Sequence, residues 1–164
     1  MRPAPVPPGP GQESVWDYPR PPRAELIRKQ CEVCFAGQTI AITLAPVRVL
    51  ETSHPPTYYF PPDSVLPGAL WEIDKTTYCE WKGVASYFDV VRGDQVAPGA
   101  AWTYRDPMPG FELIKDYVAF YPRAMEVCLV GGEFVRPQPG GYYGGWITSD
   151  IVGPFKGVEG SEGW

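Results

Sequence analysis

The sequence predicts a mainly β fold with very little helix. The chain has 164 residues, and its 21 prolines and 18 glycines interrupt it too often for long helices. The runs between these interruptions are rich in aromatic and β-branched side chains, which favour strands. The length fits one domain with a single substantial hydrophobic core. We therefore look for one site on one domain.

Charge and hydropathy exclude several classes of partner. The net charge of −5 has the wrong sign for a protein that binds a phosphate backbone through basic side chains, so we predict no nucleic acid partner. The apolar runs are too short for a signal peptide's central region or for a membrane span, so we predict no membrane partner and a cytoplasmic protein. In that reducing compartment the four cysteines are expected to be thiols.

Three regions are expected along the chain. Residues 1–23 form a proline-rich arm with too little apolar surface to fold alone, in which only Trp16 and Tyr18 can act as anchors. Residues 24–137 form the core β domain. Residues 138–164 form a glycine- and aromatic-rich tail whose apolar surface favours packing on the body or on a neighbouring subunit. A homo-oligomer is compatible with this organisation.

The first half of the core domain predicts four short elements. The segment AELIRKQ (24–30) is expected to form one or two helical turns, and CEVCFAGQTIAIT (31–43) a hairpin that turns at residues 36–38. A third strand is predicted at 47–50. Residues 58–60 read as a short strand bracketed by prolines, which confine it to a sheet edge or rim.

The second half predicts further strands. The run VASYFDVV (84–91) is the strongest strand pattern, followed by a turn at 92–95 and a continuation at 95–97. Strands are also expected at 101–104 and 117–121, with a single helical turn at 111–115 between them. Residues 124–130 are predicted to pair with 117–121 across a turn at Pro122 and Arg123.

Three blocks of the sequence carry a resemblance to a known family. VRVLETSHPPTYYFP (47–61), TTYCEWKGVASYFDV (76–90) and AAWTYRDPMP with DYVAFYPRAMEV (100–109 and 116–127) resemble the widespread bacterial family called domain of unknown function 427. The resemblance covers roughly residues 30–130. It implies a compact, antiparallel β fold in which two sheets open like a tent around a small pocket.

The family's most repeated positions fall on residues that include several candidates for a site. They are Arg48, Glu51, His54, Pro55, Tyr59, Cys79, Trp81, Lys82, Gly83, Tyr87 and Trp102. This chain departs from the pattern at Glu80, where proline is more frequent, so we expect a less rigid turn between Cys79 and Lys82. Some family members carry a nucleotidyltransferase label.

Four residues are candidate catalytic groups. His54 is the only histidine, its ordinary pKa lies near neutrality, and Glu51 three residues earlier could orient it as a general acid or base. Lys82 could lower the pKa of Cys79 for nucleophilic attack, or could itself bind an anion or form a Schiff base. The alternatives are a histidine that caps its own turn, a buried cysteine and a solvated lysine.

Seven further residues are candidate ligand contacts: Arg48, Ser53, Tyr58, Tyr59, Trp81, Tyr87 and Trp102. Aromatic rings beside Arg48, Lys82 and His54 suit a flat, anionic or heteroaromatic ligand. We expect Arg48, Glu51 and His54 on one wall of the pocket. Cys79, Trp81 and Lys82 would form the other. By default the large rings, Trp71 among them, are expected to belong mostly to the hydrophobic core, with some of them lining the pocket.

No metal site and no cofactor are predicted. The pair Cys31 and Cys34 has the CxxC spacing of a zinc site, but it lacks a second pair, and residues three apart on a strand point to opposite faces. Nucleotidyl transfer usually needs converging carboxylates and a phosphate-binding loop. The chain has neither a D-x-D pair nor a phosphate-binding loop motif, and Glu51, Glu72 and Asp74 would have to be assembled by the tertiary fold.

The sequence leaves three classes of function open. The first is a domain with one pocket that binds a small polar or aromatic metabolite. The second is a small enzyme that performs acid-base or hydrolytic chemistry in the same pocket. The third is an interaction or oligomerisation module in which the arm and the tail contact a partner. Whether the protein is an enzyme stays undecided at this level.

Overall fold

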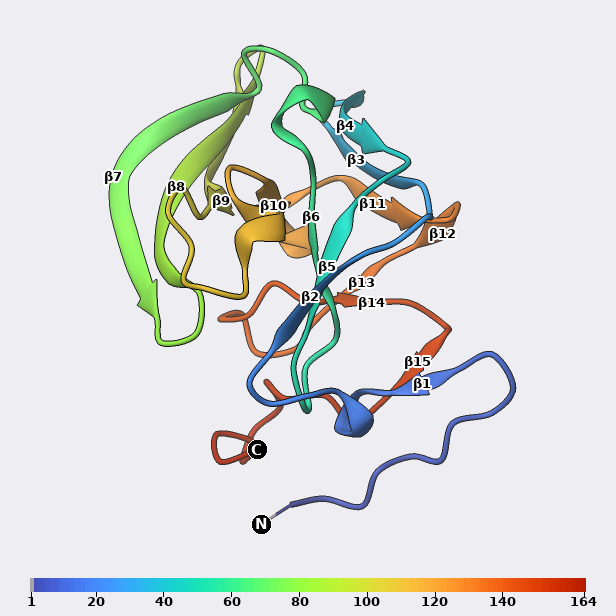
Figure 1. The fold of residues 1–164 in the computed structure, drawn as a ribbon. Coiled ribbons are helices and arrows are strands. Elements are labelled where there is room, and N and C mark those ends of the chain that lie inside the picture. The colour runs from blue at the N-terminus through green and yellow to red at the C-terminus, as the bar shows by residue number, and fades with distance from the viewer. Residues whose placement is uncertain (1) are drawn as a thin grey trace.

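The computed structural model describes residues 2–164, and in this range the fold is mainly β, as predicted. Two four-stranded sheets stand on opposite sides of a three-stranded sheet, and both termini lie at the same end of the molecule (Figure 1). The sheets do not close into a barrel. Met1, the first residue of the expected arm, lies outside the described residues. Helical structure in the described range is confined to four single 3₁₀ turns: η1 (Val15–Asp17), η2 (Pro62–Ser64), η3 (Glu112–Ile114) and η4 (Pro122–Ala124).

The first four-stranded sheet is antiparallel and has the strand order β10-β9-β8-β7. Its strands are β7 (Leu70–Cys79), β8 (Gly83–Arg92), β9 (Gln95–Thr103) and β10 (Val118–Phe120). The predicted strand at 84–91 is thus confirmed as β8, and the predicted turn ends where β9 begins. In β8, Ala85 and Tyr87 are buried because alternate side chains point to the same face of a strand.

The second four-stranded sheet has the order β12-β11-β3-β4. Its strands are β3 (Cys31–Phe35), β4 (Gln38–Thr43), β11 (Val127–Val130) and β12 (Glu133–Phe134). The predicted hairpin is confirmed, and its turn residues Ala36 and Gly37 both have positive φ, as the commonest two-residue hairpin turn requires.

The three-stranded sheet lies between the two larger ones (Figure 1). It has the order β2-β5-β6, with β2 (Arg23–Leu26), β5 (Val47–Leu50) and β6 (Thr57–Tyr59). The predicted third strand is confirmed, and β6 lies at the sheet edge as the flanking prolines indicated. Phe60, the next residue, forms an antiparallel bridge with Val118. This bridge links β6 to β10 and therefore connects the three-stranded sheet to the first four-stranded sheet.

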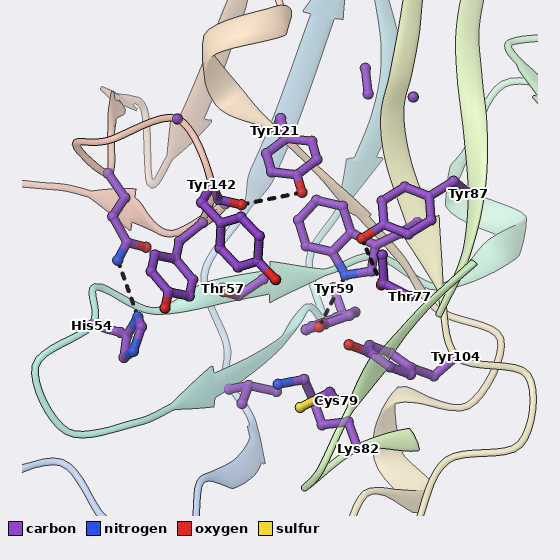
Figure 2. A pocket seen from close by; sticks show the side chains of 18 of the residues that line it. His54, Thr57, Tyr59, Thr77, Cys79, Lys82, Tyr87, Tyr104, Tyr121 and Tyr142 are labelled. Atoms are coloured by element: carbon purple, nitrogen blue, oxygen red, sulfur yellow. Dashed lines mark hydrogen bonds between the residues drawn. The ribbon is translucent and has the colours of Figure 1, made fainter. Parts of the chain in front are cut away.

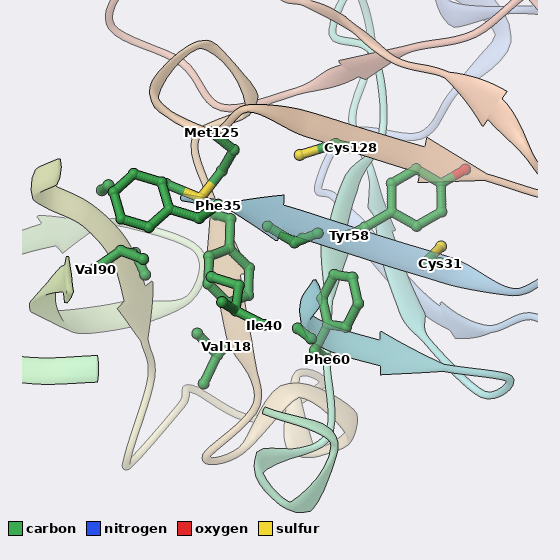
Figure 3. Packing of buried hydrophobic residues seen from close by; sticks show 14 of the residues in the cluster. Cys31, Phe35, Ile40, Tyr58, Phe60, Val90, Val118, Met125 and Cys128 are labelled. Atoms are coloured by element: carbon green, nitrogen blue, oxygen red, sulfur yellow. The ribbon is translucent and has the colours of Figure 1, made fainter. Parts of the chain in front are cut away.

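The main hydrophobic core lies between the second four-stranded sheet and strands β6, β8, β9 and β10. Side chains from these elements pack together around Tyr58 and Phe60, with Trp146 of the tail fully buried among them. Figure 3 shows part of this cluster: Cys31, Phe35, Ile40, Tyr58, Phe60, Val90, Val118, Met125 and Cys128. A second cluster fills the space between the first four-stranded sheet and β5 and β6, and the cavity described below opens from it.

The arm and the tail are both folded onto the body. Strand β1 (Glu13–Ser14) pairs in parallel with β15 (Ile151–Val152), and β13 (Arg136–Pro137) pairs with β14 (Trp146–Ile147). Trp16 and Tyr18 are buried in a third cluster together with tail residues. The arm therefore holds the tail against the domain.

Three expectations were wrong. Residues 24–26 belong to β2 rather than to a helix, because they pair with β5 along its length. Residues 127–130 pair with β3 and not with 118–120, since η4 intervenes and β10 already pairs with β9. Trp71, assigned to the core, is 68% exposed because β7 is an edge strand with most of its side chains in solvent.

Candidate functional site

A cavity of about 720 Å³ opens between the first four-stranded sheet and the β5–β6 side of the three-stranded sheet. Its wall comes from strands β5 to β9, from the segment after β10 and from the tail (Figure 2). The volume lies in the range of small-molecule sites. The side chains that matter most below are Glu51, His54, Tyr59, Lys75, Cys79, Trp81, Lys82, Tyr87, Trp102, Tyr104, Tyr121, Arg123, Gln138, Tyr142, Tyr143 and Lys156.

Strand alternation decides which residues of β5 and β6 face this cavity. Val49, Thr57 and Tyr59 line it, whereas their neighbours Arg48 and Tyr58 point to the opposite face. Arg48 and Tyr58 lie opposite each other in the antiparallel pair β5–β6, so both side chains point away from the cavity. Tyr59 is buried, and its hydroxyl lies 3.4 Å from Trp102 Nε1, which donates a hydrogen bond to it.

The turn between β7 and β8 forms the facing rim. Cys79 ends β7, Trp81 and Lys82 lie in the turn, and Gly83 opens β8 with a φ of 103°, a value that favours glycine. The turn is held by a backbone hydrogen bond from Met108 N to Lys82 O, 3.0 Å long. Figure 2 shows Cys79 and Lys82 on the side of the cavity near Tyr104. The fold thus brings this rim to the same cavity as His54.

His54 is held by a residue of the tail. Gln138 Nε2 lies 3.1 Å from His54 Nδ1 and 2.9 Å from the backbone oxygen of Lys156, while Gln138 Oε1 accepts from Gly145 N at 3.1 Å. Since the oxygen end of the amide is occupied by an N–H donor, the nitrogen end must face the imidazole. Gln138 therefore donates to Nδ1, and the neutral ring carries its proton on Nε2.

The surroundings keep His54 uncharged. Burial, together with the positive charges of Lys156, Arg20 and Lys82, lowers the pKa of His54 to about 3. Its Nε2 lies 3.8 Å from Glu51 Oε2, and Glu51 in turn lies 3.5 Å from Arg20. The ring also meets Tyr143 edge-on, with centroids 4.7 Å apart. A neutral imidazole with such a low pKa is a weak base near neutral pH.

Four cations surround the cavity, and each lies near a tyrosine ring. The distance from the charged group to the ring centroid is 4.4 Å for Lys75 and Tyr87, 5.9 Å for Lys82 and Tyr104, 4.7 Å for Arg123 and Tyr121, and 5.7 Å for Lys156 and Tyr143. Across residues 2–164, no Asp or Glu side chain pairs with any of these four, although Arg20, Lys29, Arg48 and Arg105 all have such partners. Lys156 Nζ instead donates to Trp164 O at 3.3 Å. The cavity therefore holds four basic side chains that lack a carboxylate side-chain partner within residues 2–164.

Four tyrosines of the cavity wall are hydrogen-bond donors at neutral pH. Burial raises the pKa of Tyr59, Tyr104, Tyr121 and Tyr143 above the ordinary phenol value, so their hydroxyl groups stay protonated. Neutral phenols next to ammonium and guanidinium groups can donate to an anion without adding negative charge.

The structure places eight of the eleven sequence-predicted site residues on the cavity wall. They are Glu51, His54, Tyr59, Cys79, Trp81, Lys82, Tyr87 and Trp102. The other three, Arg48, Ser53 and Tyr58, are not among its lining residues. Arg48 bonds to Glu13 and Glu25 on the other face of β5.

Ser53 and Tyr58 make structural contacts elsewhere in the protein. Ser53 is buried with a φ of 73°; its N–H donates to Val15 O and its carbonyl accepts from Lys156 N, so it ties arm and tail together. Tyr58 packs against Trp146 in the main core, with ring centroids 5.1 Å apart. The core contact explains why the Tyr58 side chain does not face the cavity, while the Ser53 Oγ is buried without a hydrogen-bond partner in residues 2–164.

Sequence reasoning missed about half of the cavity-wall side chains named above. Lys75, Tyr104, Tyr121 and Arg123 lie within the core domain but were not singled out, and Gln138, Tyr142, Tyr143 and Lys156 come from the tail. A signal for the tail was available: the motif GGYYGG at 140–145 sets two adjacent tyrosines between glycine pairs. No pattern in the sequence pointed to Gln138.

Metal ligands do not gather in the described part of the chain, where no group of three or more His, Cys, Asp or Glu side chains could hold an ion. Cys31 is buried while Cys34 points outward from the same strand, and all four cysteines are free. Burial raises the pKa of Cys31 to about 12. The helical turns of residues 2–164 include none with the length and apolarity needed to cross a lipid bilayer.

The fold and the cavity define an all-β domain built around one large aromatic and basic pocket. The chain belongs to the family described as Domain of unknown function (DUF427), whose model matches residues 23–131. The match begins at β2 and ends just after β11, so the arm and the tail lie outside it. No curated protein matches the chain in a sequence comparison.

Proposed function

We propose that this protein binds a small, planar aromatic anion in the cavity. The observation that carries the proposal is the set of four cations around an aromatic wall, each beside a tyrosine ring and none paired with a carboxylate side chain. Lys82 and Lys156 are partly buried, where a cation without a carboxylate side-chain partner is costly unless an anion joins it, whereas the exposed Lys75 and Arg123 add positive charge to the wall. Aromatic rings add stacking surface. The overall negative charge of the chain makes this local positive charge more distinctive.

The composition of the wall supports an aromatic ligand. Nine aromatic residues line the cavity, against four basic and two acidic ones. The two acidic residues are Glu51, which lies 3.5 Å from Arg20, and Glu80, which is exposed. A ligand would therefore meet rings and cations before it met an unpaired carboxylate. Such surroundings favour an aromatic carboxylate or phosphate over a neutral or cationic compound.

An enzymatic role through His54 has weaker support. Gln138 already donates to Nδ1, and the proton on Nε2 leaves the ring without a free acceptor. The pKa of about 3 further reduces the basicity that general-base catalysis requires. Instead, Nε2–H can serve as a hydrogen-bond donor toward Glu51 or a ligand. Binding is thus the function that the geometry favours.

The cellular setting and assembly follow the same reasoning. Four free cysteines suit a reducing compartment, which supports the proposal that the protein is cytoplasmic. Self-association through the tail has less support, because Trp146, Ile147 and Ile151 are buried within their own chain. Tyr142 of the tail, which is 76% exposed, lies at the cavity instead, which favours a role in ligand binding.

The test is titration calorimetry with 2-naphthoate and with its neutral isostere 2-naphthamide. We expect 2-naphthoate to bind at least about tenfold more tightly, and its affinity to fall as NaCl rises from about 50 mM to about 500 mM. Lys82→Gln and Lys75→Gln should each weaken naphthoate by about fivefold, since each removes one cation from the wall. Lys115→Gln removes an equal charge from an exposed residue outside the cavity and is the matched control.

Two results would overturn the proposal. Equal affinity for the acid and the amide would show that the cations do not select an anion. If neither compound bound at millimolar concentration, the proposal that the cavity binds an aromatic ligand would be wrong.

A further inference from the structure

A loop of the tail lies across one side of the cavity and has the features of a lid. This lid loop, residues 139–144, follows β13 and precedes β14, outside the region that the family model matches. Its tip carries Tyr142 and Tyr143, which line the cavity together with Gly141 and Gly144. Tyr142 lies beside Tyr121 in Figure 2, while its side chain as a whole is 76% exposed.

The base of the lid loop is fixed. Gln138 N donates to Gly145 O, and Gly145 N donates back to Gln138 Oε1, each at 3.1 Å. Trp146, the next residue, is fully buried in the main core. A Cβ on Gly145 would lie 2.6 Å from Pro55 Cγ, and one on Gly144 would overlap the Trp102 ring. Residues 144–146 are therefore pinned against the body.

The tip is held more lightly than the base. Its backbone is tethered by two side chains of the core domain: Tyr121 Oη donates to Tyr142 O at 3.4 Å, and Arg123 Nη2 donates to Gly141 O. Gly141 has a φ of 91°, and a Cβ there would meet nothing within 4 Å. This glycine has both the backbone freedom and the open space that a hinge requires.

Space is available for the tyrosines to move into. A second hollow of about 270 Å³ borders the same loop, and Tyr142, Tyr143 and Lys156 line both hollows. The two rings lie edge-to-face with centroids 4.8 Å apart, so they can shift as a pair. A largely exposed tyrosine at the rim gains burial when an aromatic ligand enters, which gives closure a driving force.

Arg123 connects the lid to the wall. Its guanidinium contacts Gly141 O through one nitrogen and lies near the Tyr121 ring, and in residues 2–164 no carboxylate pairs with it. Arginine has five N–H donors in a fixed fork, so the remaining donors can take a ligand oxygen while the lid contact is kept. A bound anion would then be joined to the lid backbone through one side chain.

We infer that the lid loop determines ligand specificity: Tyr142 and Tyr143 close over the planar ring of the aromatic anion, and Arg123 couples that closure to the ligand's charge. This inference rests on the proposed function, because it names the part of the same site that selects an aromatic over an aliphatic anion. Tyr142, Tyr143 and Arg123 are the specificity-determining residues. The core domain supplies Arg123, while the tail supplies the rings.

The experiment compares 2-naphthoate with hexanoate, an anion that lacks a ring, in the wild-type protein and in Tyr142→Leu. We expect Tyr142→Leu to reduce naphthoate affinity about tenfold while hexanoate affinity changes less than about twofold. Most of the loss should appear as faster dissociation in stopped-flow fluorescence. Phe134→Leu replaces an aromatic residue that is 70% exposed and does not line the cavity, and should change neither ligand.

Hydrogen exchange tests the closure directly. None of the backbone N–H groups of residues 141–144 donates a hydrogen bond within the described structure, so they should exchange rapidly in the free protein and slow at least about fivefold when naphthoate is bound. Arg123→Lys keeps the charge but loses the fork, and should reduce this protection. Because Tyr142 is exposed, its variant is expected to keep the wild-type melting temperature.

The outcomes separate the two claims. If naphthoate binds with the expected dependence on Lys82 and Lys75, but Tyr142→Leu matches Phe134→Leu and exchange in 139–144 is unchanged, the lid inference is overturned and the proposed function stands. If naphthoate does not bind the wild-type protein, the proposed function is overturned, and the lid inference is overturned with it.

Discussion

Gln138 donates a hydrogen bond to His54 across 84 positions of sequence, with the two nitrogens 3.1 Å apart. The bond joins the tail to the loop between β5 and β6, and it fixes both the position and the tautomer of the only histidine. The amide is buried, and its other two bonds run to Lys156 O and from Gly145 N within the tail. Gln138 therefore links the tail to the β5–β6 loop, and both of these regions contribute to the cavity wall.

The first prediction concerns the dependence of stability on pH. The pKa of His54 is about 3 in the folded protein and about 6.5 in an unfolded chain, so the unfolded state takes up a proton first as the pH falls. The stability contributed by the neutral imidazole is complete above pH 6.5 and is lost progressively toward pH 3. We expect the free energy of unfolding to fall by roughly 2 kcal/mol between pH 7 and pH 5, measured by urea denaturation.

His54→Gln is the control for this effect. It should remove most of the pH dependence in that window, because the chain has no other histidine and the lowered carboxyl pKa values of Glu13 and Asp150 act only at more acidic pH. Identical slopes in the variant and the wild type would contradict a depressed His54 pKa.

Gln138→Glu reverses the electrostatic environment of the imidazole. A carboxylate at this position can still accept from Gly145 N, and it can accept from Nδ1 when that nitrogen carries a proton, as in the imidazolium or the neutral Nδ1–H tautomer. Its negative charge favours the imidazolium. We expect the pKa of His54 to rise from about 3 to above about 5, followed by NMR of the single imidazole. Gln30→Glu adds the same charge at an exposed residue outside the cavity and should leave the titration unchanged. A His54 pKa that stays near 3 in Gln138→Glu would contradict the electrostatic coupling between residue 138 and the imidazole.

Gly145 lies so close to Pro55 that adding one methyl group to the glycine should be destabilising. A Cβ there would lie 2.6 Å from Pro55 Cγ and 2.8 Å from Pro55 O, distances that require the tail to shift. We expect Gly145→Ala to lower the free energy of unfolding by about 2 to 4 kcal/mol and to weaken naphthoate binding. Gly163→Ala adds a methyl group where nothing lies within 4 Å, and should change both quantities little. Equal stability of the two variants would show that the tail does not need this contact.

The strands that could be predicted from sequence are those whose burial alternates. Residues 84–91 and 31–43 have buried side chains at every second position on at least part of their length, and both were located correctly. β7 was missed because its ten residues are almost all exposed, so its sequence carries no apolar alternation. It forms only because its backbone pairs with the long neighbour β8. Local patterns do not report such pairing.

The site was predicted in part for a similar reason. The resemblance to the family pointed to His54, Cys79 and Lys82, which the fold brings to one cavity. It also pointed to Arg48, which strand alternation turns to the opposite face, and the register of a strand cannot be read from a residue type. Gln138 and Lys156 lie outside the matched region, where only the tertiary structure shows their contact with His54.

The last prediction concerns Arg48, a residue of the family pattern that lies outside the cavity. Its guanidinium bonds to Glu25 at 2.9 Å and to Glu13 at 3.0 Å, and the hydrogen bonds from Arg48 lower the pKa of Glu13. Arg48→Met removes the charge and leaves both carboxylates without this partner. Since Glu13 and Glu25 keep partial access to water, we expect a loss of stability of about 1 to 2 kcal/mol by urea denaturation.

Naphthoate binding should distinguish this variant from the cavity variants. Arg48 does not line the cavity, so Arg48→Met should keep its naphthoate affinity within about twofold under conditions where the variant is fully folded, whereas Lys82→Gln should lose about fivefold with little change in stability. A naphthoate loss in Arg48→Met as large as that in Lys82→Gln would mean that the ligand reaches the opposite face of β5. The boundary of the site would then have to be redrawn around the arm, since Glu13 of β1 is the group that Arg48 contacts there.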